Sequence, residues 1–329
     1  MNYPLTRLRR LRANSWIRDL VREHSLKPSD LIYPMFVVEG KKVKQEIKTL
    51  PGVHRLSIDL IVEQAKRAKD LGIPVVALFP AVEKKTEDAR EAFSRKNLIC
   101  RTVEAIKKHV PGIGVMCDVA LDPYTTHGHD GIVKDGDVAN DLTIEALIKQ
   151  AKVMVESGCD ILAPSDMMDG RVLKLREFLE SKGHHNIIIM SYGVKFVSSF
   201  YGPFRDAVGS SKQGGLSKLT YQVEAANAQQ ALNELVMDEQ EGADMLIIKP
   251  GMPYLDIIAQ ARGVVNVPLI AYQVSGEYAM LKFAAAAGAI NYEQALLESL
   301  IAFKRAGCSG VITYAALDLA YLYDLRVYL

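Results

Sequence analysis

The chain has 329 residues, of which 49% are hydrophobic and 24% charged, and its formal net charge is +1. This balance is typical of a globular protein in water and does not favour a nucleic acid as partner. No apolar segment approaches the ~20 residues of a transmembrane helix, so no membrane partner is expected. The four cysteines are scattered without CxxC spacing, which indicates a reducing, cytoplasmic location and argues against disulfides or a thiolate zinc site.

Residues 1–30 are predicted to form an N-terminal arm. The segment MNYPLTRLRRLRANSW is rich in arginine, but the apolar core of a secretory signal does not follow it. A solvated basic arm explains this pattern better than nucleic-acid binding.

From residue 31 onward, short apolar segments alternate with helix-length amphipathic segments, several of which end in glycine, as a helix C-cap prefers. The expected strands are 31–38, 75–79, 114–121, 161–165, 187–192, 245–251, 269–276 and 310–315. Their apolar character is typical of parallel strands covered by helices. The alternation predicts an α/β fold, a (β/α)8 TIM barrel over 31–329. An open doubly wound sheet is the second interpretation, weakened because no GxGxxG follows the first strand.

One connection is unusually long. Residues 196–222 read FVSSFYGPFRDAVGSSKQGGLSKLTYQ. Loops of this length in compact domains are commonly functional lids. Because the segment carries aromatic residues that can dock and the cations Arg205 and Lys218, we expect an active-site lid at about 196–222 and not a loose insertion.

Active sites of TIM barrels lie at the carboxyl ends of the strands. Polar residues at the expected ends are Asp118, Asp122, Ser165, Asp166, Lys195, Lys249, Tyr272, Ser275 and Tyr314. Arg205 and Lys218 of the lid, with Ser275 and Tyr314, could together bind two carboxylates. This set indicates a small acidic carbonyl substrate, bound in one or two copies.

The two lysines are the strongest chemical signal. Strand alternation places Lys249 on the face of Ile247, and it places Lys195 on the face of Ser191 if the strand continues through Gly193. Two ammonium groups on neighbouring strands repel each other, which lowers the pKa of at least one of them. A neutral lysine amine attacks ketones and aldehydes to form a Schiff base. A lysine at a strand end can also be merely solvated or bind phosphate, and the pattern alone leaves both interpretations open.

The segment MCDVALDPYTTHGHDG, residues 116–131, concentrates oxygen and nitrogen ligands that suggest a metal site. This segment, with SYGVKFVSSFYGPFRDA, GADMLIIKPGMPYLDI and AYQVSGEYAMLKFAA, resembles porphobilinogen synthase, also called 5-aminolevulinate dehydratase, and the resemblance covers nearly the whole chain. It implies a barrel whose arm embraces a neighbouring subunit in a homo-octamer. It also implies condensation of two 5-aminolevulinate molecules to porphobilinogen in tetrapyrrole and haem biosynthesis.

The resemblance also implies roles for single residues. Lys249 matches the lysine that forms a Schiff base with the substrate that becomes the propionate side, and Lys195 matches the lysine of the acetate side. The expected substrate-binding residues are Arg205, Lys218, Gln222, Tyr201 and Phe204 on the lid, and Ser275, Tyr314, Tyr272 and Ser165 at strand ends. Many relatives have arginine where this chain has Lys218. The lysine keeps the positive charge of the arginine but cannot bind a carboxylate in the same bidentate geometry.

Zinc-dependent relatives place three cysteines where this chain has Ala120, Asp122 and Asp130. Alanine cannot bind a metal, and carboxylates prefer harder ions than zinc, so no catalytic zinc is expected. Asp118, Asp122 and Asp130 are predicted to stabilise protonated amines and to move protons, although a loosely held cation is left open. Glu234 matches the glutamate that binds a stimulatory, allosteric Mg²⁺ in some relatives.

Three alternatives are weighed against this hypothesis. A class I Schiff-base aldolase is the nearest, but it requires one lysine and usually a phosphate-binding loop, for which VSGEYAM is a poor match. A metal-dependent hydrolase built on His127 and His129 lacks the later histidines such sites use. A non-catalytic scaffold would not need lysines at both strand ends.

Overall fold

The computed structural model describes residues 2–210 and 216–327, so residues 211–215 of the expected lid lie outside the described part. Eight parallel strands form a closed barrel in which the last strand pairs back with the first. In barrel order the strands are β1 Leu31–Val37, β4 Val75–Pro80, β5 Gly114–Val119, β8 Ile161–Pro164, β9 Ile188–Lys195, β10 Met245–Lys249, β11 Leu269–Gln273 and β12 Gly310–Thr313. The predicted TIM barrel is confirmed, and all eight expected strands are present.

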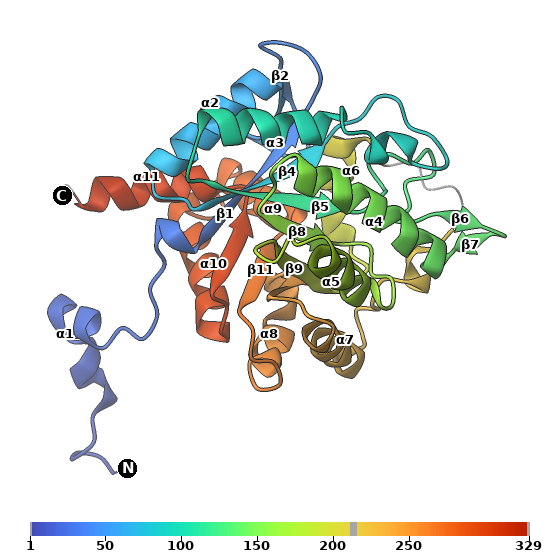
Figure 1. The fold of residues 1–329 in the computed structure, drawn as a ribbon. Helices are drawn as coiled ribbons and strands as arrows, with labels where there is room; N and C mark the ends of the chain where they lie inside the picture. The colour runs from blue at the N-terminus through green and yellow to red at the C-terminus, as the bar shows by residue number, and fades with distance from the viewer. Residues whose placement is uncertain (1, 211–215, 328–329) are drawn as a thin grey trace.

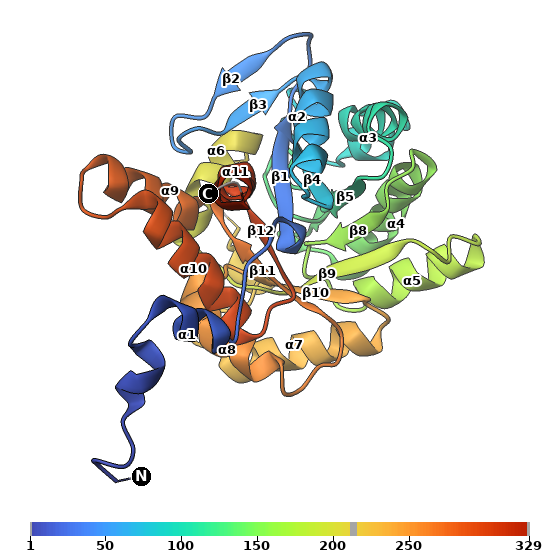
Figure 2. The ribbon, with the colours of Figure 1, turned by 90° about the vertical axis from the view of Figure 1, so that its left-hand side faces the viewer.

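Helices surround the barrel on its outside (Figures 1 and 2). They are α2 Ile58–Asp70, α3 Leu98–His109, α4 Asn140–Glu156, α5 Arg171–Ser181, α7 Ala228–Gln240, α8 Leu255–Ala261, α9 Ser275–Ala286, α10 Tyr292–Ala306 and α11 Ala316–Val327. Glycines end several of them as expected. Gly158 follows α4 at φ +94° and Gly242 follows α7 at φ +101°, a backbone conformation that side chains disfavour.

The N-terminal segment projects away from the barrel (Figures 1 and 2). It contains a short 3₁₀ helix, Leu8–Arg12, and α1, Ser15–Leu20, and neither contains a buried residue. Several of its apolar side chains are exposed, among them Leu5, Trp16 and Leu20. Within the described residues, no helix combines the length and the apolar character needed to cross a bilayer.

Two small hairpins decorate the carboxyl ends of the strands. β2 Lys44–Glu46 and β3 His54–Leu56 extend the sheet beside the end of β1. β6 Val133–Lys134 and β7 Asp137–Val138 follow the segment after β5. These hairpins enlarge the end of the barrel at which the site lies.

The described part of the lid is tied down at both its base and its helix. At the base, Phe196 and Val223 form an isolated bridge, and the backbone N–H of Val223 donates to the carbonyl of Lys195 at 3.1 Å. The lid helix α6, Gly202–Val208, is held by Arg55 of β3, whose Nε donates to the carbonyl of Ala207 at 2.6 Å. The lid is therefore packed against the barrel in this structure.

Candidate active site

The two predicted catalytic lysines end neighbouring strands. Lys195 is the last residue of β9, Lys249 is the last residue of β10, and their Cα atoms are partners in the register. Each residue is only 6% exposed. The barrel therefore brings two buried amines from distant parts of the sequence to the end where TIM-barrel chemistry takes place.

The expectation of unbroken alternation along β9 is wrong. The register between β9 and β10 shifts between Leu246 and Ile248, so β9 carries one extra residue there, which is a β-bulge. Ser191 consequently lies on the helix side of the sheet, where its hydroxyl donates to Asp238 of α7 at 2.6 Å. Lys195 lies on the interior side, so the bulge places the two residues on opposite faces.

Lys249 is enclosed by aromatic rings. Four ring centroids lie 4.9–5.1 Å from its Nζ, those of Tyr192, Tyr201, Phe204 and Tyr272. Burial lowers the pKa of Lys249 to about 7, and the positive charge of Lys195 lowers it in the same direction. Burial is the larger cause, whereas the sequence suggested repulsion between the lysines. A large fraction of Lys249 is therefore a neutral amine near pH 7.

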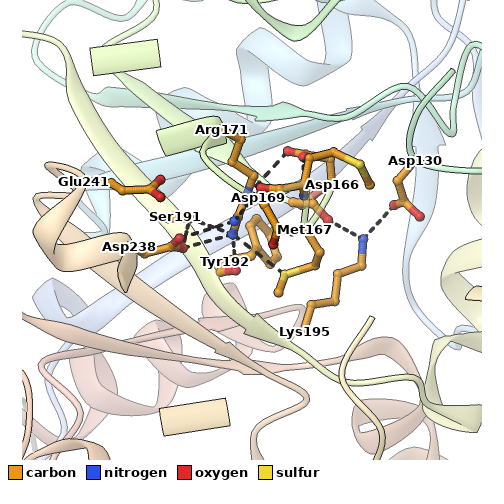
Figure 3. Close-up of polar contacts among 12 residues, drawn as sticks. Asp130, Asp166, Met167, Asp169, Arg171, Ser191, Tyr192, Lys195, Asp238 and Glu241 are labelled. Carbon is orange, nitrogen blue, oxygen red and sulfur yellow. Dashed lines mark hydrogen bonds and ion pairs between the residues drawn. The ribbon is translucent and has the colours of Figure 1, made fainter. Parts of the chain in front are cut away.

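Lys195 has the opposite environment. Its Nζ donates to Asp130 Oδ1 at 2.7 Å (Figure 3). It also donates to the carbonyl of Ser165 at 2.6 Å. Burial alone would lower the pKa of Lys195, but the negative charges of Asp130 and Asp122 outweigh it and raise the pKa above its usual value. Lys195 is thus the protonated member of the pair. Ser165 contributes its backbone oxygen to this contact.

Asp130 joins the loop after β5 to the lid. Its Oδ2 accepts hydrogen bonds from Lys218 Nζ at 2.8 Å and from the hydroxyl of Tyr221 at 2.7 Å. Burial alone would raise the pKa of Asp130, but Lys195 and Lys218 outweigh it and hold the pKa far below its usual range. Asp130 is therefore ionised, as a counter-ion to two buried ammonium groups must be.

The other two predicted acids behave differently. Burial raises the pKa of Asp118 to about 7, and the negative charge of Asp122 raises it further. Burial also raises the pKa of Asp122, with Asp130 as the second cause. Because Asp118 exchanges its proton near neutral pH, it can act as an acid and as a base in this site.

The lid brings three further predicted residues to this end of the barrel. The hydroxyl of Tyr201 donates to the carbonyl of Phe196 at 2.7 Å, and the ring of Phe204 packs against Phe79 with centroids 5.3 Å apart. Gln222 Nε2 lies 3.5 Å from Asp130 Oδ2. These contacts cover the amines with side chains of the lid.

Arg205, the remaining lid residue of the predicted set, is half-buried on α6. Its side chain makes no hydrogen bond or ion pair with any other described residue. The structure places this cation on the lid without linking it to the lysine pair.

The later strand ends supply the remaining predicted residues. Ser275 begins α9, and its Oγ accepts a hydrogen bond from the backbone N–H of Phe204 at 3.0 Å. The hydroxyls of Tyr272 and Tyr314 lie 3.2 Å apart. Tyr314 also stacks on Phe36, with ring centroids 5.7 Å apart. These groups form a polar edge on the aromatic enclosure, next to the lid helix.

The two histidines of the 116–131 segment bond to protein groups. His129 Nδ1 lies 3.1 Å from the hydroxyl of Tyr221, and His127 Nδ1 accepts from the backbone N–H of His129 at 3.1 Å. Among the residues that the structure describes, no group of three or more His, Cys, Asp or Glu side chains is arranged to hold a metal.

Glu234 lies outside the amine cluster, on α7. Burial raises the pKa of Glu234, and the negative charges of Asp238 and Asp169 raise it further, while Arg171 lowers it. Among the neighbouring charges, Arg171 has the largest effect on this pKa, and Asp238 and Asp169 act against it. One carboxylate of this kind fits a Mg²⁺ ion that keeps most of its waters.

Sequence reasoning missed three residues at this site. Extrapolated alternation does not predict that Tyr192 faces the site. Gly193 in the strand interior is a sequence signal for a bulge, and a Cβ at that position would lie 2.8 Å from Leu235. Tyr221, whose hydroxyl donates a hydrogen bond to Asp130, lies in a polar loop, where no sequence pattern marks it as a site residue.

The third missed residue is Glu277 of α9, which has negligible exposure. Its carboxylate accepts from the backbone N–H groups of Met252 and Val274, both at 2.5 Å, and so holds the segment that follows Lys249. A glutamate three residues after the helix N-cap could have revealed its helix-terminal role, but not its hydrogen bond to the distant segment after β10.

Comparisons with known proteins agree with this geometry. The family model "Delta-aminolevulinic acid dehydratase" matches residues 5–322. A delta-aminolevulinic acid dehydratase of Bradyrhizobium diazoefficiens is 51% identical over 94% of this chain and 88% of its own length. That of Rhodobacter capsulatus is 48% identical over 95% of each chain.

A solved structure agrees as well. The delta-aminolevulinic acid dehydratase (porphobilinogen synthase) of Toxoplasma gondii ME49, determined in complex with the reaction product porphobilinogen, superimposes with a TM-score of 0.94. It is 44% identical and covers 96% of this chain and 91% of its own. Family model, identity and barrel geometry lead to one conclusion: this chain belongs to the delta-aminolevulinic acid dehydratase family.

Proposed function

We propose that this enzyme, a lyase, condenses two molecules of 5-aminolevulinate to porphobilinogen, an early step of tetrapyrrole biosynthesis. The observation that carries the proposal is the lysine pair, in which Lys249 has a pKa of about 7 and Lys195 is held protonated by Asp130. The runner-up, a class I aldolase, needs only one such amine and does not explain the second lysine with its own counter-ion.

The neutral amine of Lys249 attacks the ketone carbon of one substrate, and water leaves as the imine forms. Lys195 must lose a proton before it can form an imine with the second substrate. Asp130 already accepts a hydrogen bond from its Nζ, and Asp118, with a pKa of about 7, can take up and return protons nearby. An enamine from one substrate then attacks the other, and amine exchange closes the pyrrole and frees both lysines. Two substrates give one product and two molecules of water.

The substrate carboxylates need cationic or hydroxyl partners. Ser275 and Tyr314, at adjoining strand ends, suit one carboxylate, and Arg205 with Lys218 and Gln222 suits the other. Lys218 donates to Asp130 in this structure. To bind a substrate carboxylate, it must give up or share that contact, which couples substrate binding to the charge on Asp130. The packed lid would then exclude bulk water and protect the imines from hydrolysis.

Borohydride trapping tests the proposal. We expect incubation with 5-aminolevulinate and borohydride to leave a reduced adduct on the peptide that contains Lys249, detected by mass spectrometry. The variant Lys249→Met should carry no adduct at that position and form no porphobilinogen. Porphobilinogen formation without any adduct on either lysine would contradict the two-imine chemistry.

The metal requirement belongs to the same proposal. Ala120 offers no ligand, and both carboxylate oxygens of Asp130 already accept hydrogen bonds from protein groups, which supports catalysis without zinc in this loop. We place a stimulatory, hydrated Mg²⁺ at Glu234, which the resemblance indicates and near which Asp238, Asp169 and Glu241 add further negative charge. Activity that survives a zinc-selective chelator and rises with added Mg²⁺ would support this assignment, and complete loss on zinc-selective chelation would contradict it.

Assembly and location complete the proposal. The projecting arm with its exposed apolar side chains supports a contact with another copy, and we propose a homo-octamer, located in the cytoplasm. Native mass spectrometry of the full chain tests the octamer, and a variant with Trp16 and Leu20 both changed to Ser should form smaller species. A monomeric wild-type chain with full activity would contradict the assembly.

A further inference from the structure

Arg171 is among the largest fully buried side chains in the described residues, with 2% exposure. It stands in the first turn of α5 and touches neither catalytic lysine. Its Nη2 donates to Asp238 Oδ2 at 2.9 Å, to Ser191 Oγ at 3.2 Å and to the carbonyl of Tyr192 at 3.0 Å (Figure 3). A single guanidinium thus joins three elements, α5, α7 and the bulge of β9.

A first set of contacts connects Arg171 with the surroundings of Lys195. Arg171 Nη1 donates to the carbonyl of Met168 at 3.2 Å, and its Nε lies 3.8 Å from Asp166 Oδ2. Asp166 Oδ1 in turn accepts from the backbone N–H of Met168 at 2.8 Å. Arg171 therefore fastens the turn after β8, which begins with the Ser165 carbonyl that accepts the hydrogen bond of Lys195 Nζ.

A second set of contacts connects Arg171 with the surroundings of Lys249. The carbonyl of Tyr192, which accepts from Arg171, belongs to the bulged part of β9, and the ring of Tyr192 lies 5.0 Å from Lys249 Nζ. Asp238 Oδ2 accepts from both Arg171 and Ser191, so the residue before Tyr192 is held by the same cluster. The guanidinium of Arg171 therefore holds the part of β9 that supplies one of the rings around Lys249.

The bulge makes this support necessary. An extra residue in a strand interrupts the ladder and leaves backbone groups to be satisfied by other partners. A guanidinium can reach several acceptors at once in a fixed geometry, which a lysine ammonium on a flexible chain cannot do. A buried ion pair does not by itself add stability over apolar residues of the same volume, so its role here is the geometry that it imposes.

We propose that Arg171 is a positioning residue for the condensation, which sets the relative geometry of both amines through the turn after β8 and the bulge of β9. This inference rests on the proposed two-lysine function. Loss of the guanidinium of Arg171 should make Tyr192 more mobile and admit water to Lys249. The pKa of the Lys249 amine should then rise toward the usual value for lysine. It should also release the Ser165 carbonyl from its place beside Lys195.

The test compares Arg171→Lys with Arg176→Lys. Arg176 stands on the same helix and donates to Asp244 at 2.5 Å and to the carbonyl of Ile187 at 3.3 Å, at the opposite end of β9. Each variant is measured for kcat, KM and the pH dependence of borohydride trapping on Lys249. We expect Arg171→Lys to lose about tenfold to a hundredfold in kcat, with KM nearly unchanged. The pH at which borohydride trapping on Lys249 rises should be higher in this variant than in the wild type. Arg176→Lys should match the wild type in both.

A second variant keeps the test decisive if Arg171→Lys does not fold. Arg171→Met combined with Asp238→Leu replaces the ion pair by apolar side chains of similar size, a change that buried pairs often tolerate. It removes the contact to Tyr192, so it should show the same kcat loss and pH shift. Folded variants with wild-type kcat and trapping profile would overturn the role of Arg171. A wild-type enzyme without adduct or product would instead contradict the proposed function.

Discussion

Lys195 and Lys249 are register partners on neighbouring strands, yet their pKa values move in opposite directions from the same starting point. Asp130 compensates the burial of Lys195, whereas aromatic rings surround Lys249. Two residues of one type thus acquire different protonation states at one pH, which lets one attack a ketone while the other holds a charge.

The pH dependence of imine formation follows from Lys249. Its free amine predominates above its pKa of about 7 and falls by about tenfold per pH unit below it. Trapping on Lys249 should therefore rise through pH 7 and level off, as measured by adduct mass against pH. The positive charge of Lys195 lowers the pKa of Lys249. The variant Lys195→Met removes that charge, so trapping on Lys249 should begin to rise at a higher pH than in the wild type. A wild-type rise near the usual lysine value of 10.5 would contradict the assignment.

Asp130→Asn should impair both catalysis and stability. The variant leaves Lys195 and Lys218 buried without their counter-ion, and breaking a buried pair costs on the order of 3–5 kcal/mol. We expect a large loss of kcat and a lower midpoint in urea denaturation. Asp135→Asn, an exposed change on the neighbouring hairpin, serves as control and should alter neither quantity. Equal unfolding midpoints for the two variants would show that Asp130 does not carry this charge balance.

The anchoring of the lid can be weakened without touching the lysines. Arg55→Ala removes donors to the carbonyls of Asp206 and Ala207 on α6. Hydrogen bonds from a charged group contribute about 1.5–3 kcal/mol, so the lid should open more often and KM should rise about tenfold or more. Amide hydrogen exchange of residues 197–210 should become faster in the same variant. Arg90→Ala, which removes an exposed contact to Asp88, is the control. Unchanged exchange in Arg55→Ala would contradict this account of the lid.

Mg²⁺ should act through Glu234. The variant Glu234→Gln removes the carboxylate, so the difference between activity in EDTA and activity in Mg²⁺ should disappear. Binding of Mg²⁺ by the full chain, followed by calorimetry, should weaken in parallel. Glu298→Gln, on the exposed side of α10, should keep both responses. A full Mg²⁺ response in Glu234→Gln would place the ion elsewhere.

Several features of this protein could be read from local patterns. Apolar segments, glycine caps and alternating helices predicted the barrel, because each depends on neighbours in the chain. The positions of Lys195 and Lys249 at strand ends followed from the same patterns, whereas the role of the long connection as a lid stays a prediction.

The tertiary structure alone decided how these parts act together. The bulge in β9 turned Tyr192 toward Lys249 and Ser191 away from it, against simple alternation, because residues on α5 and α7 satisfy the interrupted strand. Asp130 selected which lysine stays protonated, although it lies far from both in the sequence. Strand positions depend on short-range periodicity, but pKa values and side-chain orientation depend on burial and on charges that only folding brings together.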